Sequence, residues 1–214
     1  MVDSGTATSR LSAKTLGTVA MVALALQPVI VWLFMFVIAA DVAWTEPDSN
    51  YALGELGWLR NVGFLTTAIG ALALGLGIRQ RLEGKGVRRT TIFFYIGAVG
   101  QFGAGIFNTD PTMEGSPHDL FALVSLIGLL GALFSMRGLF ARNEAWKPLA
   151  VPALIASLWF VVAVVVAITN IVEAGFVQRF IFAPVTGWMI WVAWNVRQGR
   201  SGSHDNLHRE PSTL

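Results

Sequence analysis

The chain has no cysteine and few charged residues. Only 13% of its 214 residues are Asp, Glu, Lys or Arg, against roughly 25% in an ordinary soluble domain. The absence of cysteine excludes disulfides, thiolate metal sites, iron–sulfur clusters and a cysteine nucleophile. The formal net charge of +2 is too small to attract a polyanion, so a nucleic-acid partner is not expected.

Apolar residues supply 54% of the chain, and the mean hydropathy is +0.61. This composition excludes the water-soluble and disordered classes and predicts a membrane protein. A helix needs about 20 mostly apolar residues to cross about 30 Å of hydrocarbon. We therefore predict an all-α, polytopic membrane helix bundle with six transmembrane helices, of which the third and sixth are short. The stretches are Thr15–Ala40, Leu59–Ile78, Thr91–Phe107, Leu120–Arg137, Pro148–Asn170 and Phe180–Val196.

Basic residues lie on alternate connecting segments, and this pattern sets the predicted orientation. All but two of the 15 Lys and Arg residues fall in the N-terminal tail, the second and fourth loops and the C-terminal tail. Because Lys and Arg favour the cytoplasmic side, both termini are predicted to be cytoplasmic and the chain to lie in the cytoplasmic membrane. The two exceptions, Arg60 and Arg179, lie at the outer side, where most acidic residues also fall.

Three regions are predicted along the chain. Residues 1–14 form a cytoplasmic N-terminal tail, residues 15–197 form the six-helix transmembrane domain, and residues 198–214 form a disordered cytoplasmic tail. Glycines recur in the second, third and fourth spans. Such small faces let helices approach closely in lipid, so they indicate helix packing and offer faces for a second copy or a partner membrane protein.

Polar side chains gather near the outer ends of the predicted spans. Such groups are costly at membrane depth, so several of them together indicate a functional site. The first, third and fifth loops share the outer side, and their residues can therefore meet in one outward-facing polar pocket. The candidate ligand-binding residues are Arg60, Asn61, Gln101, Asn108, Glu173, Gln178 and Arg179.

His118 is the candidate for acid–base chemistry, because the other two histidines lie in the C-terminal tail. Asp119 follows it and Asp110 precedes it, and a carboxylate beside an imidazole orients the ring for proton exchange. The structural alternative is that His118 and Asp119 cap the fourth helix while Asp110 ends the third. One histidine with scattered carboxylates lacks metal-ligand spacing, so no metal site is predicted.

The two outer arginines also have two interpretations. As functional groups, Arg60 and Arg179 bind an anionic head group or a carboxylate with two parallel hydrogen bonds. As structural groups, they hold helical hairpins together by pairing with outer acidic residues. Those acidic residues are Glu55, Glu173, Asp110 and Asp119.

Three segments of the chain carry a resemblance to a known family. They are Asn50–Phe64, which contains Trp58-Leu-Arg60-Asn61; Gly105–Phe121, which contains Asn108-Thr-Asp110-Pro and Pro117-His118-Asp119; and Gly175-Phe-Val-Gln178-Arg179.

With these segments and its six-span length, the chain resembles the bacterial and archaeal membrane family catalogued as domain of unknown function 998. It is also distantly similar to the Frag1/DRAM/Sfk1 group of six-span proteins. The family pattern has a Phe-Pro-x-Asp stretch, a histidine that opens the next helix and an arginine before the last helix. The resemblance therefore implies Asp110, His118 and Arg179 as the matching residues, while Asn108 stands where the family has proline. It implies no assigned activity.

Three functions remain open from the sequence. The first is a non-enzymatic protein that binds or moves a small molecule or lipid through the outer pocket. The second is a lipid-modifying enzyme in which His118 acts as acid and base. The third is a structural or accessory subunit that assembles through glycine-rich faces. No nucleophile motif, phosphate loop or cofactor motif occurs, so no cofactor is predicted.

Overall fold

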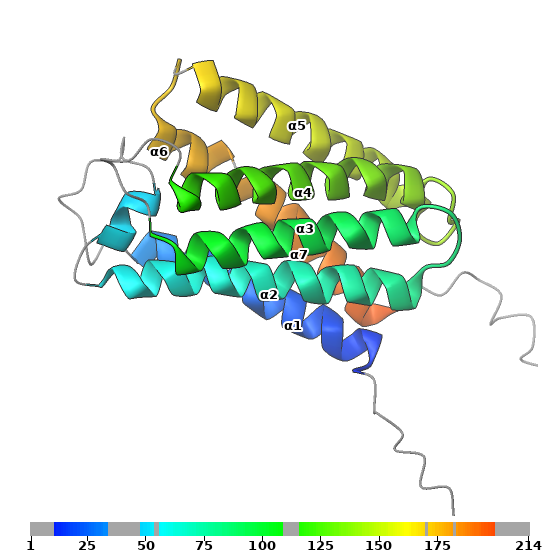
Figure 1. Ribbon diagram of the computed structural model, residues 1–214. Coiled ribbons are helices and arrows are strands. Elements are labelled where there is room, and N and C mark those ends of the chain that lie inside the picture. The colour runs from blue at the N-terminus through cyan, green and yellow to red at the C-terminus, as the bar shows by residue number, and fades with distance from the viewer. Residues whose placement is uncertain are drawn as a thin grey trace, which may run out of the picture.

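A computed structural model describes residues 11–33, 48–53, 56–108, 116–169, 171–181 and 183–199. Within these ranges the chain is helical and has no strand, which confirms the all-α prediction. Successive long helices run antiparallel to each other (Figure 1). They are α1 (Ala13–Leu33), α2 (Gly57–Arg81), α3 (Val87–Ile106), α4 (Pro117–Phe140), α5 (Ala150–Thr169) and α7 (Ala183–Gln198).

Within the described ranges, four short elements connect the long helices. Two of them, η2 (Asp48–Leu53) and η3 (Lys147–Leu149), are 3-10 turns that precede α2 and α5. The other two, α6 (Ala174–Phe176) and the π-helical η4 (Val177–Ile181), lead into α7. A π turn is rare and is often found at functional sites.

The predicted spans coincide with the long helices, and the differences lie at helix ends. The second span extends to Gly57 and Arg81, and the fourth extends to Pro117 and Phe140, because polar end residues continue the helical backbone. The predicted sixth span begins inside η4 rather than at the start of α7. Parts of the predicted first and fifth spans and of both predicted tails lie outside the described residues. These parts are residues 1–10, 34–40, 170 and 200–214.

Four helical segments in the described chain are long and apolar enough to cross a membrane. They are α1, α2, α4 and the continuous segment Lys147–Thr169 that contains η3 and α5. The third and sixth predicted spans, which were short in the sequence, correspond to α3 and to the 16-residue α7. The protein is therefore a helical membrane protein.

The helices form a ring in which each contacts its neighbours in the chain. Helices α1 to α5 pack in sequence, and α7 closes the ring by contacting both α5 and α1. We call the end where α2 and α4 begin the distal end. The opposite end, with the α2–α3 and α4–α5 connections, is the proximal end (Figure 1).

Glycines set the closest helix approach, between α3 and α4. A Cβ atom added at Gly100 would lie 2.2 Å from the backbone nitrogen of Ser125, and one at Gly128 would lie 2.2 Å from that of Gly97. Bulky residues at these positions would force the two helices apart. The small faces of α3 and α4 are thus occupied by neighbours within the same chain.

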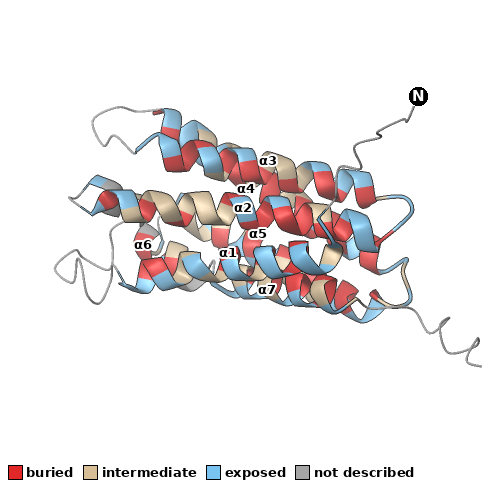
Figure 2. Cartoon of the chain, turned by 90° about the horizontal axis from the view of Figure 1, so that it is seen from below, coloured by how far each residue is buried: buried red, intermediate tan, exposed pale blue. Residues whose placement is uncertain are grey.

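The apolar core is densest toward the proximal end. The buried residues of α2 and α4 lie mainly in the proximal halves of these helices. Figure 2 shows buried residues gathered toward the proximal end of the bundle. Phe94, Met136 and Phe140 are completely buried, and the ring of Phe140 stacks on that of Trp146 with centroids 5.3 Å apart. Apolar packing in the proximal half therefore holds the helices together, and the interior of the distal half need not be close-packed.

Candidate functional site

A cavity of about 490 Å³ lies inside the distal half of the bundle. Its described lining comes from α1, α2, α3, α4, α5, η2, η4 and α7, so the ring of helices surrounds it. Most of the lining residues are apolar. The sequence-predicted site residues among them are Arg60, Gln101, His118, Gln178 and Arg179.

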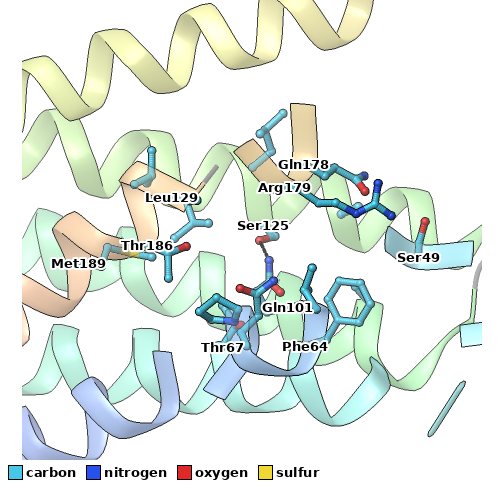
Figure 3. A pocket seen from close by; sticks show the side chains of 18 of the residues that line it. Ser49, Phe64, Thr67, Gln101, Ser125, Leu129, Gln178, Arg179, Thr186 and Met189 are labelled. Carbon is cyan, nitrogen blue, oxygen red and sulfur yellow. Dashed lines mark hydrogen bonds between the residues drawn. The ribbon is translucent and has the colours of Figure 1, made fainter. Parts of the chain in front are cut away.

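The two arginines that break the charge pattern both line this cavity and are buried, with 3% of Arg60 and 6% of Arg179 exposed. Arg179 and Gln178 come from η4, and Figure 3 shows their side chains extending toward the end of the cavity where Ser49 of η2 lies. The π turn thus places two successive polar residues at the distal end of the cavity.

An aromatic ring links Arg60 to His118. The Cζ atom of Arg60 lies 3.9 Å from the ring centroid of Phe64, one helical turn further along α2. The ring of Phe64 in turn meets the imidazole edge to face, with centroids 5.6 Å apart. A cation over an aromatic face is stabilised by the ring quadrupole. Phe64 therefore holds the guanidinium and the imidazole at the same wall of the cavity.

His118 is held by the end of α3. Its Nδ1 atom lies 3.1 Å from the carbonyl oxygen of Ala104 and 2.9 Å from that of Phe107. Carbonyl oxygens only accept, so Nδ1 carries the proton in the neutral ring and Nε2 is the acceptor. The contact satisfies carbonyls in the last turn of α3, which have no partner within their own helix.

The carboxylate of Asp119 contacts Ser116 in the described structure and not the ring of His118. Its carboxylate accepts from the backbone nitrogen of Ser116 at 3.1 Å and from the Ser116 hydroxyl at 2.9 Å. Ser116 accepts in return from the Asp119 backbone at 3.3 Å, which completes a capping box. The structural alternative holds for Asp119, whereas His118 closes α3 instead of capping α4. Asp110 lies outside the described residues.

Neutral polar groups lie deeper in the cavity. The amide nitrogen of Gln101 donates to the hydroxyl of Ser125 at 2.7 Å, across the close α3–α4 contact (Figure 3). Thr67 of α2 and Thr186 of α7 also line the cavity. These groups give the middle of the cavity hydrogen-bonding capacity without charge.

The remaining candidates do not line the cavity. The side-chain amide of Asn61 donates to that of Asn108 at 2.8 Å, which ties the start of α2 to the end of α3. This bond gives Asn108, the departure from the family pattern, a structural role. Glu173 is exposed, next to α6. Glu55, a suggested partner of the arginines, lies outside the described residues.

Sequence reasoning missed several residues of the site. Two of them had a local signal: the Ser-x-x-Asp spacing of Ser116 and Asp119 is that of a capping box, and Phe64 follows Arg60 by one helical turn. The others had none, because their place depends on how separate helices are rotated against each other. They are Ser49, Thr67, Ser125, Phe160 and Thr186.

The described lining is suited to an anion or a hydrogen-bond acceptor rather than to a metal. Its charged members are Arg60 and Arg179, and no Asp or Glu occurs among the described lining residues. Nor do three His, Asp or Glu side chains converge anywhere in the part of the chain that the structure describes.

The three segments quoted for the family resemblance contribute Arg60, His118, Gln178 and Arg179 to this one cavity. A family model described as protein of unknown function (DUF998) matches residues 8–195. The chain belongs to this family. The match includes α1 to α6 and all but the last three residues of α7, so the resemblance to the DUF998 family is confirmed. No curated protein and no solved structure matches the chain, and the similarity to the Frag1/DRAM/Sfk1 group stays a prediction.

Proposed function

We propose that this DUF998 protein binds or moves a small molecule or lipid through its distal cavity. The observation that carries the proposal is the meeting of Arg60, Gln101, His118, Gln178 and Arg179, from separate elements, around one cavity of an otherwise apolar bundle. Burying polar and ionised groups at membrane depth is costly, and such groups usually serve a function. The cavity volume of about 490 Å³ lies within the range of roughly 300–1,000 Å³ that is usual for ligand pockets.

The protein is further proposed to be a multi-pass protein of the cytoplasmic membrane, with six spans, cytoplasmic termini and the cavity near the outer face. The basic residues at the proximal end, among them Lys85, Arg88 and Arg142, support this orientation because the cytoplasmic ends of spans and their loops are rich in Lys and Arg. Exposed apolar residues along α5, such as Ile155 and Ile168, support contact with membrane lipids.

Filling the cavity tests the binding function. Gly187 lines the cavity where it reaches the surface, and a Cβ atom there would meet nothing within 4 Å, so Gly187→Leu should fold and place a bulky side chain at the opening of the cavity. Gly138 on α4 also has nothing within 4 Å and does not line the cavity, so Gly138→Leu is the matched control. Native mass spectrometry of the purified proteins should show bound lipid or small molecule on the wild type and on Gly138→Leu, and none on Gly187→Leu. Equal occupancy of all three would contradict the proposal.

The absence of cysteine makes the orientation simple to test. Single-cysteine variants Glu173→Cys and Lys85→Cys place a thiol at an exposed site of each end of the bundle. An impermeant maleimide applied to intact cells should label only the variant at 173, and the variant at 85 should react after permeabilisation. Labelling of both in intact cells, or of 85 alone, would overturn the proposed orientation.

A lipid-modifying activity is the second candidate function. It is favoured by His118, which lines the cavity with Nδ1 held by carbonyl oxygens and Nε2 left to exchange a proton. Incubating the purified protein with membrane lipids should then change their composition by mass spectrometry. The His118→Ala protein should leave it unchanged. An unchanged profile with the wild type would exclude this second function and leave the binding function in place.

A further inference from the structure

We infer that the cavity takes an amphiphile with an anionic oxyacid head group, a phosphate or carboxylate, and an apolar tail. The inference rests on the proposed function and names the ligand class for the same site. It is carried by the order in which charged, neutral polar and apolar residues follow one another along the cavity.

The polarity of the lining falls with depth from the distal end. Arg60 lies in the first turn of α2, His118 in the first turn of α4, and Arg179 in η4 before α7. Gln101 and Ser125 lie deeper, and Leu129 lies deeper still. Helix α4 advances about 16 Å between His118 and Leu129, at about 1.5 Å per residue. The cavity therefore has a charged end, a neutral polar middle and an apolar floor.

The charged end matches an oxyacid group. A guanidinium has five N–H donors, and a bidentate contact with one carboxylate or phosphate uses two of them. Arg60 and Arg179 can therefore each bind a ligand oxygen while also contacting protein groups. Both are almost completely buried, where a hydrogen bond between ionised groups is stronger than in water. Gln178, next to Arg179, adds an amide donor at the same end.

The deep end matches an apolar tail. Phe160 of α5 and Met189 and Ile190 of α7 line it together with Leu129. Leu123 of α4 and Gly187 of α7 line the cavity and are also exposed, so the cavity reaches the surface of the bundle beside these helices. A tail longer than the cavity can therefore continue toward the lipid, which a water-soluble anion alone would not need.

Binding to the wild-type protein in detergent tests the ligand class directly. The probes are palmitate and palmitoyl lysophosphatidic acid, which have an anionic head and a tail; monopalmitin, which has a neutral head and a similar tail; and inorganic phosphate, which has no tail. Both anionic amphiphiles should bind at least about tenfold more tightly than monopalmitin, since hydrogen bonds to charged groups are the stronger ones. If monopalmitin binds as tightly as the anionic amphiphiles, the assignment of an anionic head group is overturned. If inorganic phosphate binds as tightly, the assignment of an apolar tail is overturned.

Variants of the two arginines test whether the preference for an anionic head group comes from the cavity. Arg60→Gln and Arg179→Gln should each reduce the ratio of lysophosphatidic acid to monopalmitin affinity by about tenfold. Arg179→Lys should keep part of that ratio, because it retains the charge but not the bidentate geometry. Arg142→Gln, in the exposed α4–α5 connection, is the matched control and should leave the ratio unchanged. An unchanged ratio in both folded cavity variants would overturn the inference.

The two proposals fail in distinguishable ways. If monopalmitin and the anionic amphiphiles bind equally and Gly187→Leu abolishes all of this binding, the cavity is a ligand site and only the head-group inference is overturned. If no amphiphile binds the wild type, the ligand-class inference is overturned, and the proposed function is overturned with it only if native mass spectrometry also finds no other bound molecule on the wild type. If Gly187→Leu binds all of the amphiphiles as the wild type does, they do not bind in the cavity and the proposed function itself is overturned.

Discussion

The proximal and distal halves of the bundle are built from the same helices but use their interior differently. In the proximal half, large apolar side chains such as Phe94, Met136 and Phe140 are completely buried and fill the space between helices. In the distal half, the same ring of helices encloses a cavity of about 490 Å³ and carries the buried arginines and His118. The close-packed apolar core and the proposed binding site thus lie at opposite ends of one helix bundle.

This difference follows from side-chain size and polarity rather than from helix type. Close-packed interiors lose stability when a side chain is shortened, because the surrounding atoms relax only partly into the space. A residue beside an existing cavity has fewer contacts to lose. Equivalent substitutions in the two halves should therefore have unequal effects, and the first two of the following four comparisons measure this difference.

Two methionines give the largest expected contrast. Met136 is completely buried in the proximal half, whereas Met189 is buried but lines the cavity. Met136→Ala should lower the free energy of unfolding by about 2–5 kcal/mol. Met189→Ala should lower it by roughly half as much or less. Thermal unfolding of both variants in one detergent measures the contrast, and equal losses would show that the distal half is as tightly packed as the proximal half.

Two glycines give the next contrast. At Gly17 an added Cβ would lie 2.6 Å from the backbone nitrogen of Arg197, so Gly17→Ala must separate α1 from α7. The expected loss is about 1–3 kcal/mol. Gly187→Ala has open space and removes a flexible residue from a helix, so it should be neutral or stabilising by up to about 1 kcal/mol. A fluorescence-based thermal scan compares the two; similar midpoints would contradict the close α1–α7 approach.

Variants of His118 separate its structural role from its chemical one. His118→Ala leaves carbonyls of α3 without their donor and should cost about 1–3 kcal/mol. His118→Asn keeps an N–H donor at the δ position and should recover much of that stability, but it lacks Nε2. Ser116→Ala removes only the α4 cap, should cost about 1 kcal/mol and serves as the stability control.

If His118→Asn is stable yet loses ligand binding or lipid modification, Nε2 has a chemical role in the cavity. If His118→Asn binds and reacts as the wild type does, the histidine serves only to close α3. Both readouts use the native mass spectrometry and lipid assays proposed for the cavity.

The smallest expected effect is the bond between Asn61 and Asn108, which lies outside the cavity. Single alanine substitutions and their double combination form a cycle, and the coupling should be about 0.5–1 kcal/mol. Thermal unfolding of the four proteins measures it. A coupling near zero would show that this distal contact does not hold α2 and α3 together.

Much of the helical architecture could be predicted from the sequence, because apolar length and helix-end residues are local properties. In the described chain, each of the six apolar stretches overlaps one long helix, and the sixth begins within η4 before α7. The different roles of two adjacent polar residues could not be predicted in this way. Arg60 lines the cavity while Asn61 turns to Asn108, and His118 reaches α3 while Asp119 caps its own helix.

Successive residues of an α-helix point about 100° apart, so a polar pair on one turn faces two different neighbours. The sequence alone determined the membrane class, the positions of the helices and the family, since hydrophobic length and short motifs are written along the chain. Which polar residue of each pair enters the cavity was decided by the rotation of each helix about its axis. That rotation depends on contacts between distant residues, such as Gly128 against Gly97 and Gly17 against Arg197.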